Sequence, residues 1–404
     1  MKMITSIVIL FFLSILCLQT QDLNYLEIMN KINKDSLYSY IAELSGEKQC
    51  LIDGELITLD RLNRNGNESA TKYLFQKLEE FGYQPQILKC ENNTTNVENV
   101  ICKNSGIKNS DDIIVICAHY DSEAYADFAP GADDNATGCA VVLELARILK
   151  NNIQNKTIVF AFWDAEEWGL IGSSCYAKSA FENDLNLVAI INLDMIGYDP
   201  NNSNKTKLNT RSSEKDIDLW NNTQHFNNLY SINLNFETIN SQHSGSDMIS
   251  FWNKGFTGIS FAEGDYNPYY HTEADRIEFI NFDYLLLNAK LVTVLLLETA
   301  NDGIESSVYD NTNYLNEIII YPIPASDFIT IQFSNKELQL FAEGDKVQIY
   351  DVLGIERMSV GTGLDLSSQS SDLSTNTQTI DVSHLPSGVY FIKVGDKIGR
   401  FVKN

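Results

Sequence analysis

Apolar and polar residues follow two different periods along this chain. Over residues 23–44 and 68–81, leucine, isoleucine, tyrosine and phenylalanine recur every three or four positions, which is the spacing of an amphipathic helix. Gly82 is a typical helix stop after the second segment. We therefore predict two amphipathic helices before the first long apolar run.

Continuous apolar runs alternate with helical segments from Asp112 onward. Strands are predicted for the runs IIVICA, TIVFAFW and LVAIINLDM and for residues 258–262. Helices are predicted over 138–150, directly after Gly172, and over 246–254 and 284–300, and the polar stretch 199–210 is predicted to be a loop. This alternation indicates an α/β fold, a doubly wound and mostly parallel sheet with helices on both faces.

The pattern changes after a polar segment that begins near residue 301. Residues 319–404 lack a helical period and contain short β-type runs, such as FITIQF and GVYFIKV, separated by Gly, Ser, Pro and Asp. This pattern is typical of a small all-β sandwich. The expected organisation is a leader over 1–20, an α/β domain over 21–302, a linker over 303–318 and a β-sandwich over 319–404.

Length and charge narrow the function classes. A chain of 404 residues is long enough for two or three domains. Its formal net charge of -25 repels nucleic acid and anionic membrane surfaces, so neither is expected as a partner.

The N-terminal sequence has the form of an export signal. One lysine precedes an apolar run over residues 7–18, which is too short to span a bilayer comfortably. We predict cleavage near Thr20 and no transmembrane anchor. A lipoprotein signal at Cys17 is the alternative, although Leu16 stands where such signals have a small residue.

Several cysteines remain beyond the predicted leader. Cys90 and Cys102 flank a polar stretch between two strand-like runs, so a hairpin could bring them together in a disulfide. Cys117, Cys139 and Cys175 lie inside predicted strands or helices and are expected to be buried thiols.

Two adjacent glutamates, Glu166 and Glu167, follow the apolar run TIVFAFW. In an open α/β sheet the carboxyl ends of parallel strands face the ligand crevice, so this position favours an active site. A solvated helix start is the alternative, because acidic side chains also favour helix N-termini.

Other residues of metal-ligand type stand at or after strand ends. His119 ends the first strand, with Asp121 two residues later; a Gly-bounded loop over 130–138 carries two aspartates; Asp194 follows a very apolar run; and His271 follows the last strand. Each alone has a simpler explanation, such as a hydrogen-bonded structural histidine or a helix cap. Together they favour a metal site, because those separate explanations would all have to coincide.

In this order and spacing, the residues resemble those of the secreted aminopeptidases with co-catalytic zinc, a peptidase family that includes glutamate carboxypeptidase and glutaminyl cyclase. The resemblance covers residues 22–300 and implies release of N-terminal residues from peptide substrates, with two zinc ions per chain. It implies the following roles: His119 and Asp194 on one zinc, Glu167 and His271 on the other, Asp134 bridging both, Glu166 as general base, and Asp121 as the acid behind His119. Histidine and carboxylate ligands without cysteine suit an open catalytic zinc site.

The resemblance extends to residues around the metal. Tyr270 matches a tyrosine that donates a hydrogen bond to the scissile carbonyl in some relatives, and a simple pocket wall is the alternative. Met195 and Phe261 are expected to line an apolar pocket, which implies a preference for hydrophobic N-terminal residues.

Two positions depart from the family pattern. Met248 stands where many relatives have a histidine, and His243 replaces a tyrosine of one branch. These departures put the details of transition-state stabilisation in doubt and leave the reaction class unchanged. His225 and His384 are expected to lie outside the site.

The tail, which includes IYPIPASDFITI and ends in GVYFIKVGDKIGRFVKN, resembles the C-terminal sorting domain of type IX secretion cargo. The resemblance implies recognition by the type IX secretion machinery and export through a Gram-negative outer membrane, to a secreted or cell-surface location. We expect a monomer. An accessory sandwich that binds carbohydrate or substrate is the alternative for this segment.

Two other functions fit parts of the pattern. One is glutaminyl cyclase, which has a similar sheet but binds one zinc, and the other is a non-catalytic binding module on the same fold. The complete set of implied ligands, together with the implied base, favours hydrolysis over both.

Overall fold

The computed structural model describes the chain in segments. These are residues 25–62, 64–92, 95–240, 245–301, 319–321, 325–332, 346–351, 355–361, 377–386, 388–394 and 397–403. The predicted leader, the predicted linker and His243 lie outside them. The chain divides into two compact units, residues 1–304 and 305–404, and the division falls within the predicted linker.

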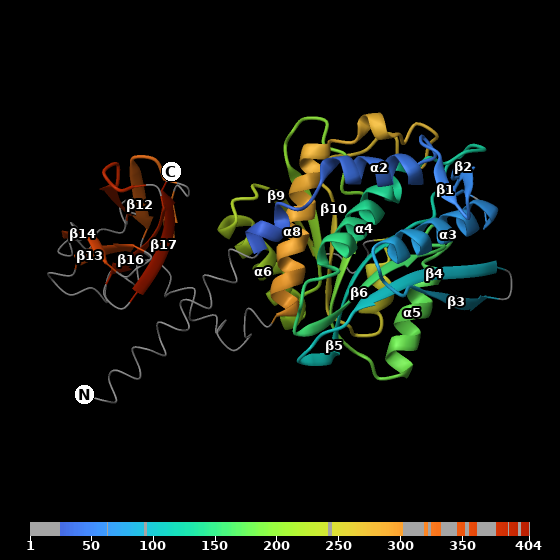
Figure 1. The fold of residues 1–404 in the computed structure, drawn as a ribbon, viewed down its shortest axis with the longest axis horizontal. Coiled ribbons are helices and arrows are strands. Elements are labelled where there is room, and N and C mark those ends of the chain that lie inside the picture. The colour runs from blue at the N-terminus through green and yellow to red at the C-terminus, as the bar shows by residue number, and fades with distance from the viewer. Residues whose placement is uncertain are drawn as a thin grey trace. The chain divides into compact units, whose positions relative to one another are not determined.

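An eight-stranded mixed sheet forms the centre of the first unit (Figure 1). Its strands, in spatial order, are β3 (Gln86–Asn92), β4 (Thr95–Asn104), β6 (Lys156–Trp163), β5 (Asn109–His119), β7 (Asn186–Leu193), β10 (Gly258–Glu263), β8 (Lys205–Thr210) and β9 (Asn235–Asn240). The central strands β6, β5, β7 and β10 are parallel, whereas β4 and β8 run antiparallel to them. The parallel centre confirms the predicted α/β fold, and the outer strands make the sheet mixed.

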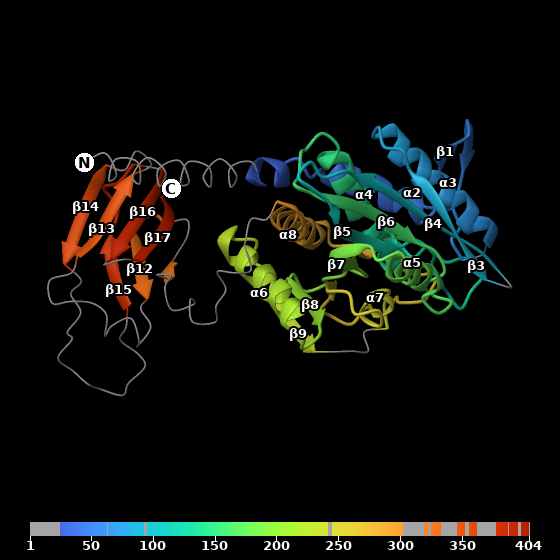
Figure 2. The same ribbon diagram turned by 90° about the horizontal axis from the view of Figure 1, so that it is seen from below.

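Helices cover both faces of this sheet (Figure 2). One face packs against α2 (Lys34–Leu44), α3 (Arg64–Glu80), α4 (Gly138–Leu149) and α8 (Phe282–Ala300), and the other against α5 (Ile171–Glu182) and α7 (Met248–Trp252). Ile114 and Ile116 of β5 join the first core, and Val115 and Cys117 join the second. Because successive strand residues point to opposite faces, one continuous apolar run serves both cores.

Smaller elements complete the first unit. They are the hairpin β1 (Cys50–Ile52) and β2 (Glu55–Ile57), the short helices η1 (Ala132–Thr137) and η2 (Ile277–Phe279), and α6 (Glu214–Leu229), which packs beside α8. Among the helices that the structure describes, none is long and apolar enough to cross a membrane.

Two predicted elements differ from the observed ones. The predicted helix over 23–44 is interrupted, because Asn33 caps α2 by accepting hydrogen bonds from the backbone N–H groups of Asp35 and Ser36. The predicted loop over 199–210 is wrong in its second half, where β8 pairs with β10 on one side and β9 on the other. The sequence of β8, KTKLNT, has only one large apolar residue, so this segment forms a strand because it pairs with its neighbouring strands.

The disulfide also differs from the prediction. Cys90 is bonded to Cys175 of α5, and Cys102 is a buried free thiol. In the β3–β4 hairpin Cys90 lies opposite Val97, five residues before Cys102, so the register keeps the predicted pair apart. Cys117 and Cys139 are buried free thiols, as predicted, whereas the same prediction is wrong for the disulfide-bonded Cys175.

The second unit is a small β-sandwich. One antiparallel sheet contains β11 (Ile319–Tyr321), β12 (Phe328–Gln332) and β15 (Thr377–Asp381), and the other contains β14 (Glu356–Gly361), β13 (Lys346–Asp351), β16 (Gly388–Val394) and β17 (Lys397–Lys403). Apolar side chains from both sheets, including Ile329 and Ile349, share one core. His384 is exposed in this unit.

Candidate metal centre

The predicted ligands meet at one edge of the sheet because four parallel strands end there. His119 is the last residue of β5, Asp194 follows β7 directly, Glu166 and Glu167 follow β6, and His271 follows β10. Neighbouring parallel strands have their carboxyl ends on the same side, so residues far apart in sequence converge. They line one cavity of about 590 Å³.

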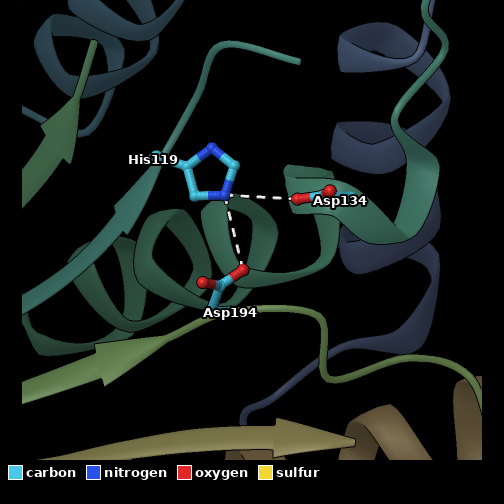
Figure 3. A group of neighbouring side chains, drawn as sticks. All are labelled: His119, Asp134 and Asp194. Carbon is cyan, nitrogen blue, oxygen red and sulfur yellow. Dashed lines mark hydrogen bonds and ion pairs between the residues drawn. The ribbon is translucent and has the colours of Figure 1, made fainter. Parts of the chain in front are cut away.

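His119 is buried, with 2% of its surface exposed. Its Nε2 lies 3.2 Å from Oδ1 of Asp134 and 3.4 Å from Oδ1 of Asp194 (Figure 3). Its Nδ1 lies 3.1 Å from the backbone carbonyl oxygen of Asp121. A carbonyl only accepts, so Nδ1 carries the proton in the neutral ring and the Nε2 lone pair faces the two carboxylates.

Asp134 stands between the two histidines. Its other oxygen, Oδ2, lies 3.3 Å from Nε2 of His271, and that nitrogen lies 2.9 Å from Oε2 of Glu167. The Asp134 carboxylate thus presents one oxygen to each of two groups of potential metal ligands. The first group also contains His119 and Asp194, and the second also contains His271 and Glu167.

The donor set fits zinc. Two ligands of a tetrahedral zinc ion, with bonds of about 2.0–2.1 Å, are roughly 3.3 Å apart, which is close to the separations around Asp134. His271 Nε2 and Glu167 Oε1 are buried atoms that make no hydrogen bond with any residue the structure describes. The short contact between His271 Nε2 and Glu167 Oε2 therefore lacks hydrogen-bond geometry, as expected of two atoms that face one cation.

The electrostatics also favour a cation. Burial, together with the nearby charges of Asp247, Asp194 and Asp121, raises the pKa of Glu166 to about 10, although His119 lowers it. Burial and the charge of Asp134 raise the pKa of Glu167 to about 7. Buried carboxylates crowded in this way are costly to ionise unless positive charge is placed among them, as a divalent metal would do.

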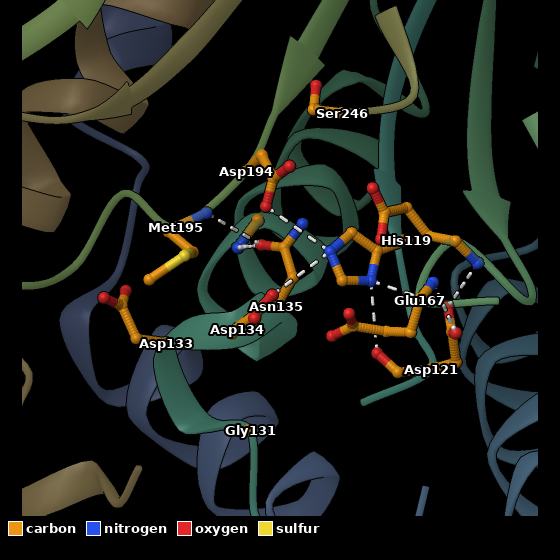
Figure 4. A network of polar contacts seen from close by, with 12 residues as sticks. His119, Asp121, Gly131, Asp133, Asp134, Asn135, Glu167, Asp194, Met195 and Ser246 are labelled. Atoms are coloured by element: carbon orange, nitrogen blue, oxygen red, sulfur yellow. Dashed lines mark hydrogen bonds and ion pairs between the residues drawn. The ribbon is translucent and has the colours of Figure 1, made fainter. Parts of the chain in front are cut away.

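Asp121 connects the first histidine to the glutamate pair. Its two carboxylate oxygens accept hydrogen bonds from the backbone N–H groups of Glu166, at 3.0 Å, and Glu167, at 3.1 Å. The same carboxylate lies 3.5 Å from Nδ1 of His119 (Figure 4). One side chain therefore fixes residues from the ends of both β5 and β6.

Three residues that the sequence did not single out hold the loop that carries Asp134. Asp275 accepts hydrogen bonds from the backbone N–H groups of Asp133 and Asp134. The fully buried guanidinium of Arg61 donates to the carbonyl oxygens of Tyr120, Pro130 and Gly131. The Asn135 side chain donates to Leu193 O and accepts from the backbone N–H of Met195, which ties the loop to the end of β7 (Figure 4). Loop contacts of this kind leave no periodic signal in a sequence.

Glu123 is a further acidic residue that the sequence did not single out. Its carboxylate, with Glu167 and His271, forms a group of potential ligand atoms that all lie within 4.8 Å of one another. It follows His119 by four residues in a segment without strand or helix periodicity, so only its proximity in the fold reveals it.

The predicted pocket residues fall into two groups. Met195 and Tyr270 line the cavity, and the Tyr270 ring stacks on His271 with 3.7 Å between ring centres. Phe261 does not line the cavity, which corrects the prediction. Its neighbours Ser260 and Ala262 line it instead. Phe261 points to the opposite face of β10 and joins the first core. Strand alternation is the reason.

The remaining positions noted in the sequence lie elsewhere. Met248 is fully buried in the core beside α5. His225 is on α6, and neither it nor His384 is among the described residues that line the cavity.

Comparisons with known proteins identify the family of this chain. Residues 99–296 match the model of a family described as Peptidase family M28. A probable leucine aminopeptidase of Arthroderma otae (strain ATCC MYA-4605 / CBS 113480) is 30% identical over 282 residues, which cover 64% of this chain and 74% of that protein. The chain belongs to peptidase family M28.

Other similar proteins place this M28 chain among proteins of the same fold. Aminopeptidase YwaD of Bacillus subtilis (strain 168) is 31% identical over 275 residues, covering 66% of this chain and 55% of YwaD. The solved LapA aminopeptidase of Legionella pneumophila has a TM-score of 0.60 at 21% identity, covering 69% of this chain and 75% of LapA. The glutaminyl cyclase of Macrostomum lignano has a TM-score of 0.55 at 17% identity, covering 68% and 91%. The M28 chain thus spans little more than half the length of YwaD, and the solved structures show a shared fold.

The second unit of the M28 chain has its own match. Residues 319–404 match the model of a domain described as a secretion system C-terminal sorting domain.

Proposed function

We propose that this M28 member is a secreted metallo-aminopeptidase that hydrolyses N-terminal residues from peptides. The observation that carries the proposal is the position of Asp134, whose two oxygens lie 3.2 and 3.3 Å from Nε2 of His119 and of His271. This arrangement supports two ions, one held by His119 and Asp194 and the other by Glu167 and His271, with Asp134 shared. Zinc, when bound, supplies a Lewis acid and lowers the pKa of water at the site.

Glu166 is the proposed general base. It lines the cavity beside the implied ligands, and its backbone is fixed by Asp121. Its carboxylate takes a proton from the attacking water and passes it to the leaving amine. Burial and neighbouring carboxylates hold its pKa near 10. Positive charge among those carboxylates lowers that pKa towards the range that a base needs.

Tyr270 is the proposed donor to the substrate. It lines the cavity, and 48% of its surface is exposed. We propose that this hydroxyl donates a hydrogen bond to the scissile carbonyl oxygen as negative charge develops there. The expected preference for hydrophobic N-terminal residues depended on Met195 and Phe261, and only Met195 lines the cavity.

We also propose that the sorting domain directs export through the type IX machinery, to the medium or to the cell surface. A mass measurement of the secreted protein tests this, because it shows whether residues 1–20 and the tail are removed. Recovery of the unprocessed chain in the cytoplasm only would contradict it.

Substrate turnover by the full-length protein tests the proposed activity. Leucine p-nitroanilide should be hydrolysed, and a chelator should stop the reaction until zinc is restored. Glutamine β-naphthylamide tests glutaminyl cyclase chemistry in the same assay: conversion to pyroglutamyl product without hydrolysis of either substrate would refute the aminopeptidase proposal.

Two matched variants separate the roles of the adjacent glutamates. Glu166→Gln should lower kcat by at least about 10³-fold while zinc content stays at the wild-type level, because this side chain is not a proposed ligand. Glu167→Gln should lower zinc content as well. A Glu166→Gln rate within tenfold of wild type would exclude Glu166 as the base.

A further inference from the structure

The cavity wall formed by β8 and β10 is polar. These strands pair antiparallel, with Lys207 opposite Ala262 and Asn209 opposite Ser260. All four side chains line the cavity. Directly paired residues share a face, so they form one patch on the sheet.

This patch adjoins the metal centre. The backbone N–H of Asp194 donates to the carbonyl oxygen of Phe261, and the backbone N–H of Glu263 donates to the carbonyl oxygen of Met195. Ser260 and Ala262 therefore flank the point at which β10 contacts Asp194. A substrate with its scissile bond at the metal centre has this wall beside it.

Two hydrogen-bond donors on the wall have no protein partner. Lys207 is half-buried, and its ammonium group forms no hydrogen bond or ion pair with any residue the structure describes. Asn209 is 8% exposed, and its side-chain amide forms none within the same described segments. Convergent polar groups aimed into a cavity are what fixes the orientation of a ligand.

The acidic groups near this wall do not neutralise Lys207. Asp265 pairs with Lys205 at 3.6 Å and accepts a hydrogen bond from the Ser203 hydroxyl. Burial and the adjacent Asp133 carboxylate raise the pKa of Glu263 well above its ordinary value, which disfavours its charged form. Glu237 faces Lys207 from β9 but is exposed and forms no ion pair with it. Lys207 is the one Lys or Arg among the described residues that line the cavity.

We infer that this wall binds the side chain of the substrate's N-terminal residue and that it prefers a carboxylate, as in N-terminal glutamate or aspartate. The inference rests on the proposed aminopeptidase activity and replaces the expected hydrophobic preference. Lys207 supplies a charge-assisted hydrogen bond, and the Asn209 amide supplies a second donor. Ser260, whose hydroxyl accepts from the Asn192 amide, keeps its own proton for a further hydrogen bond.

The net charge of -25 opposes acidic substrates at long range. Salt limits that effect, because charges more than about 8 Å apart are largely screened at physiological ionic strength. A half-buried ammonium group in contact with a carboxylate is screened much less. The local contact therefore decides the preference.

The test compares kcat/KM for the p-nitroanilides of glutamate, glutamine, leucine and lysine, using the full-length zinc-loaded protein. Wild type should prefer glutamate over near-isosteric glutamine by at least about tenfold. Lys207→Met should lower kcat/KM for glutamate by about 10–100-fold and leave leucine within threefold, which also shows that the variant folds. The control Lys103→Met removes an exposed lysine on β4 and should leave all four values unchanged.

A binding measurement gives a second readout. By calorimetry, free glutamate should bind the wild-type protein more tightly than glutamine, and Lys207→Met should abolish the difference. Faster hydrolysis of leucine than of glutamate by wild type would overturn the inference and leave the aminopeptidase proposal intact. If none of the four substrates is hydrolysed, the proposed aminopeptidase activity is refuted. In that case the binding measurement still tests the inference, and equal binding of glutamate and glutamine would overturn it.

Discussion

The carboxylate of Asp121 accepts a hydrogen bond from the backbone N–H of Glu166 at 3.0 Å. The contact joins the segment after β5 to the segment after β6, forty-five residues further along the chain. It leaves the Glu166 side chain free to face the cavity while its backbone is held. The proposed base is thus positioned by a residue that itself stands behind a proposed zinc ligand, His119.

Asp121→Asn should therefore disturb both halves of the centre. An amide has only one accepting atom, so its NH₂ group would face the backbone N–H of either Glu166 or Glu167. We expect zinc affinity and kcat each to fall by about 10–100-fold. Competition with a chromophoric chelator measures the affinity. The control is Asp111→Asn on β5, an exposed position where no change is expected. Wild-type zinc affinity in Asp121→Asn would exclude the positioning role.

Arg61→Met should loosen the loop that carries Asp134. The guanidinium donates to three carbonyl oxygens, two of them in that loop, and each buried acceptor left unpaired costs about 1–3 kcal/mol. We expect the free energy of unfolding to fall by at least about 3 kcal/mol, together with weaker zinc binding. Urea denaturation measures the first effect. Arg276→Met, at a partly exposed arginine, is the control, and equal losses in both variants would argue against a specific role for Arg61.

Removing the Cys90–Cys175 disulfide should destabilise the first unit. The bond closes a loop with a sequence separation of 85 residues, for which the chain-entropy model gives roughly 4–5 kcal/mol. The double variant Cys90→Ala/Cys175→Ala should lose stability in denaturant, and the loss should match that of reduced wild type. Cys102→Ala serves as the matched control because Cys102 is a buried free thiol. A peptide map showing Cys90 linked to Cys102 would contradict the structure.

Glu43 should make stability depend on pH in the acidic range. Burial alone would raise its pKa, but hydrogen bonds from Lys48 and Tyr73 lower the pKa below its ordinary value. A carboxyl group with a lowered folded-state pKa adds stability above its unfolded-state pKa, near 4.5, and loses that contribution as pH falls through the folded-state pKa.

Glu43→Gln should therefore lower the free energy of unfolding by about 1–3 kcal/mol at pH 7, with the difference from wild type shrinking below about pH 4.5. The measurement needs a chelator throughout, so that loss of zinc at acidic pH does not contribute. Glu55→Gln, at an exposed glutamate of β2, should show no such pH-dependent difference. A difference that grows towards acidic pH would show that the sign is wrong.

The elements that were predicted well share one property. The runs that became β5, β6 and β7 are apolar enough to be buried on both faces, so their sequence alone excludes most other environments. By contrast, β8 contains two lysines, an asparagine and two threonines, and it is a strand because its backbone bonds to β10 and β9. Two of its side chains, Lys207 and Asn209, line the cavity and are therefore not required to be apolar.

The sequence by itself determined the class of chemistry and the strand ends from which it comes. Histidines and carboxylates after apolar runs are costly to bury without a cation, and each of these residues can be identified from the sequence alone. Only the tertiary structure decided which atoms face one another: Asp134 between the two histidines, Cys90 against Cys175, and Lys207 on the cavity wall while Phe261 turns into the core. These relationships depend on strand register and on contacts between distant segments, and no local pattern in the chain encodes them.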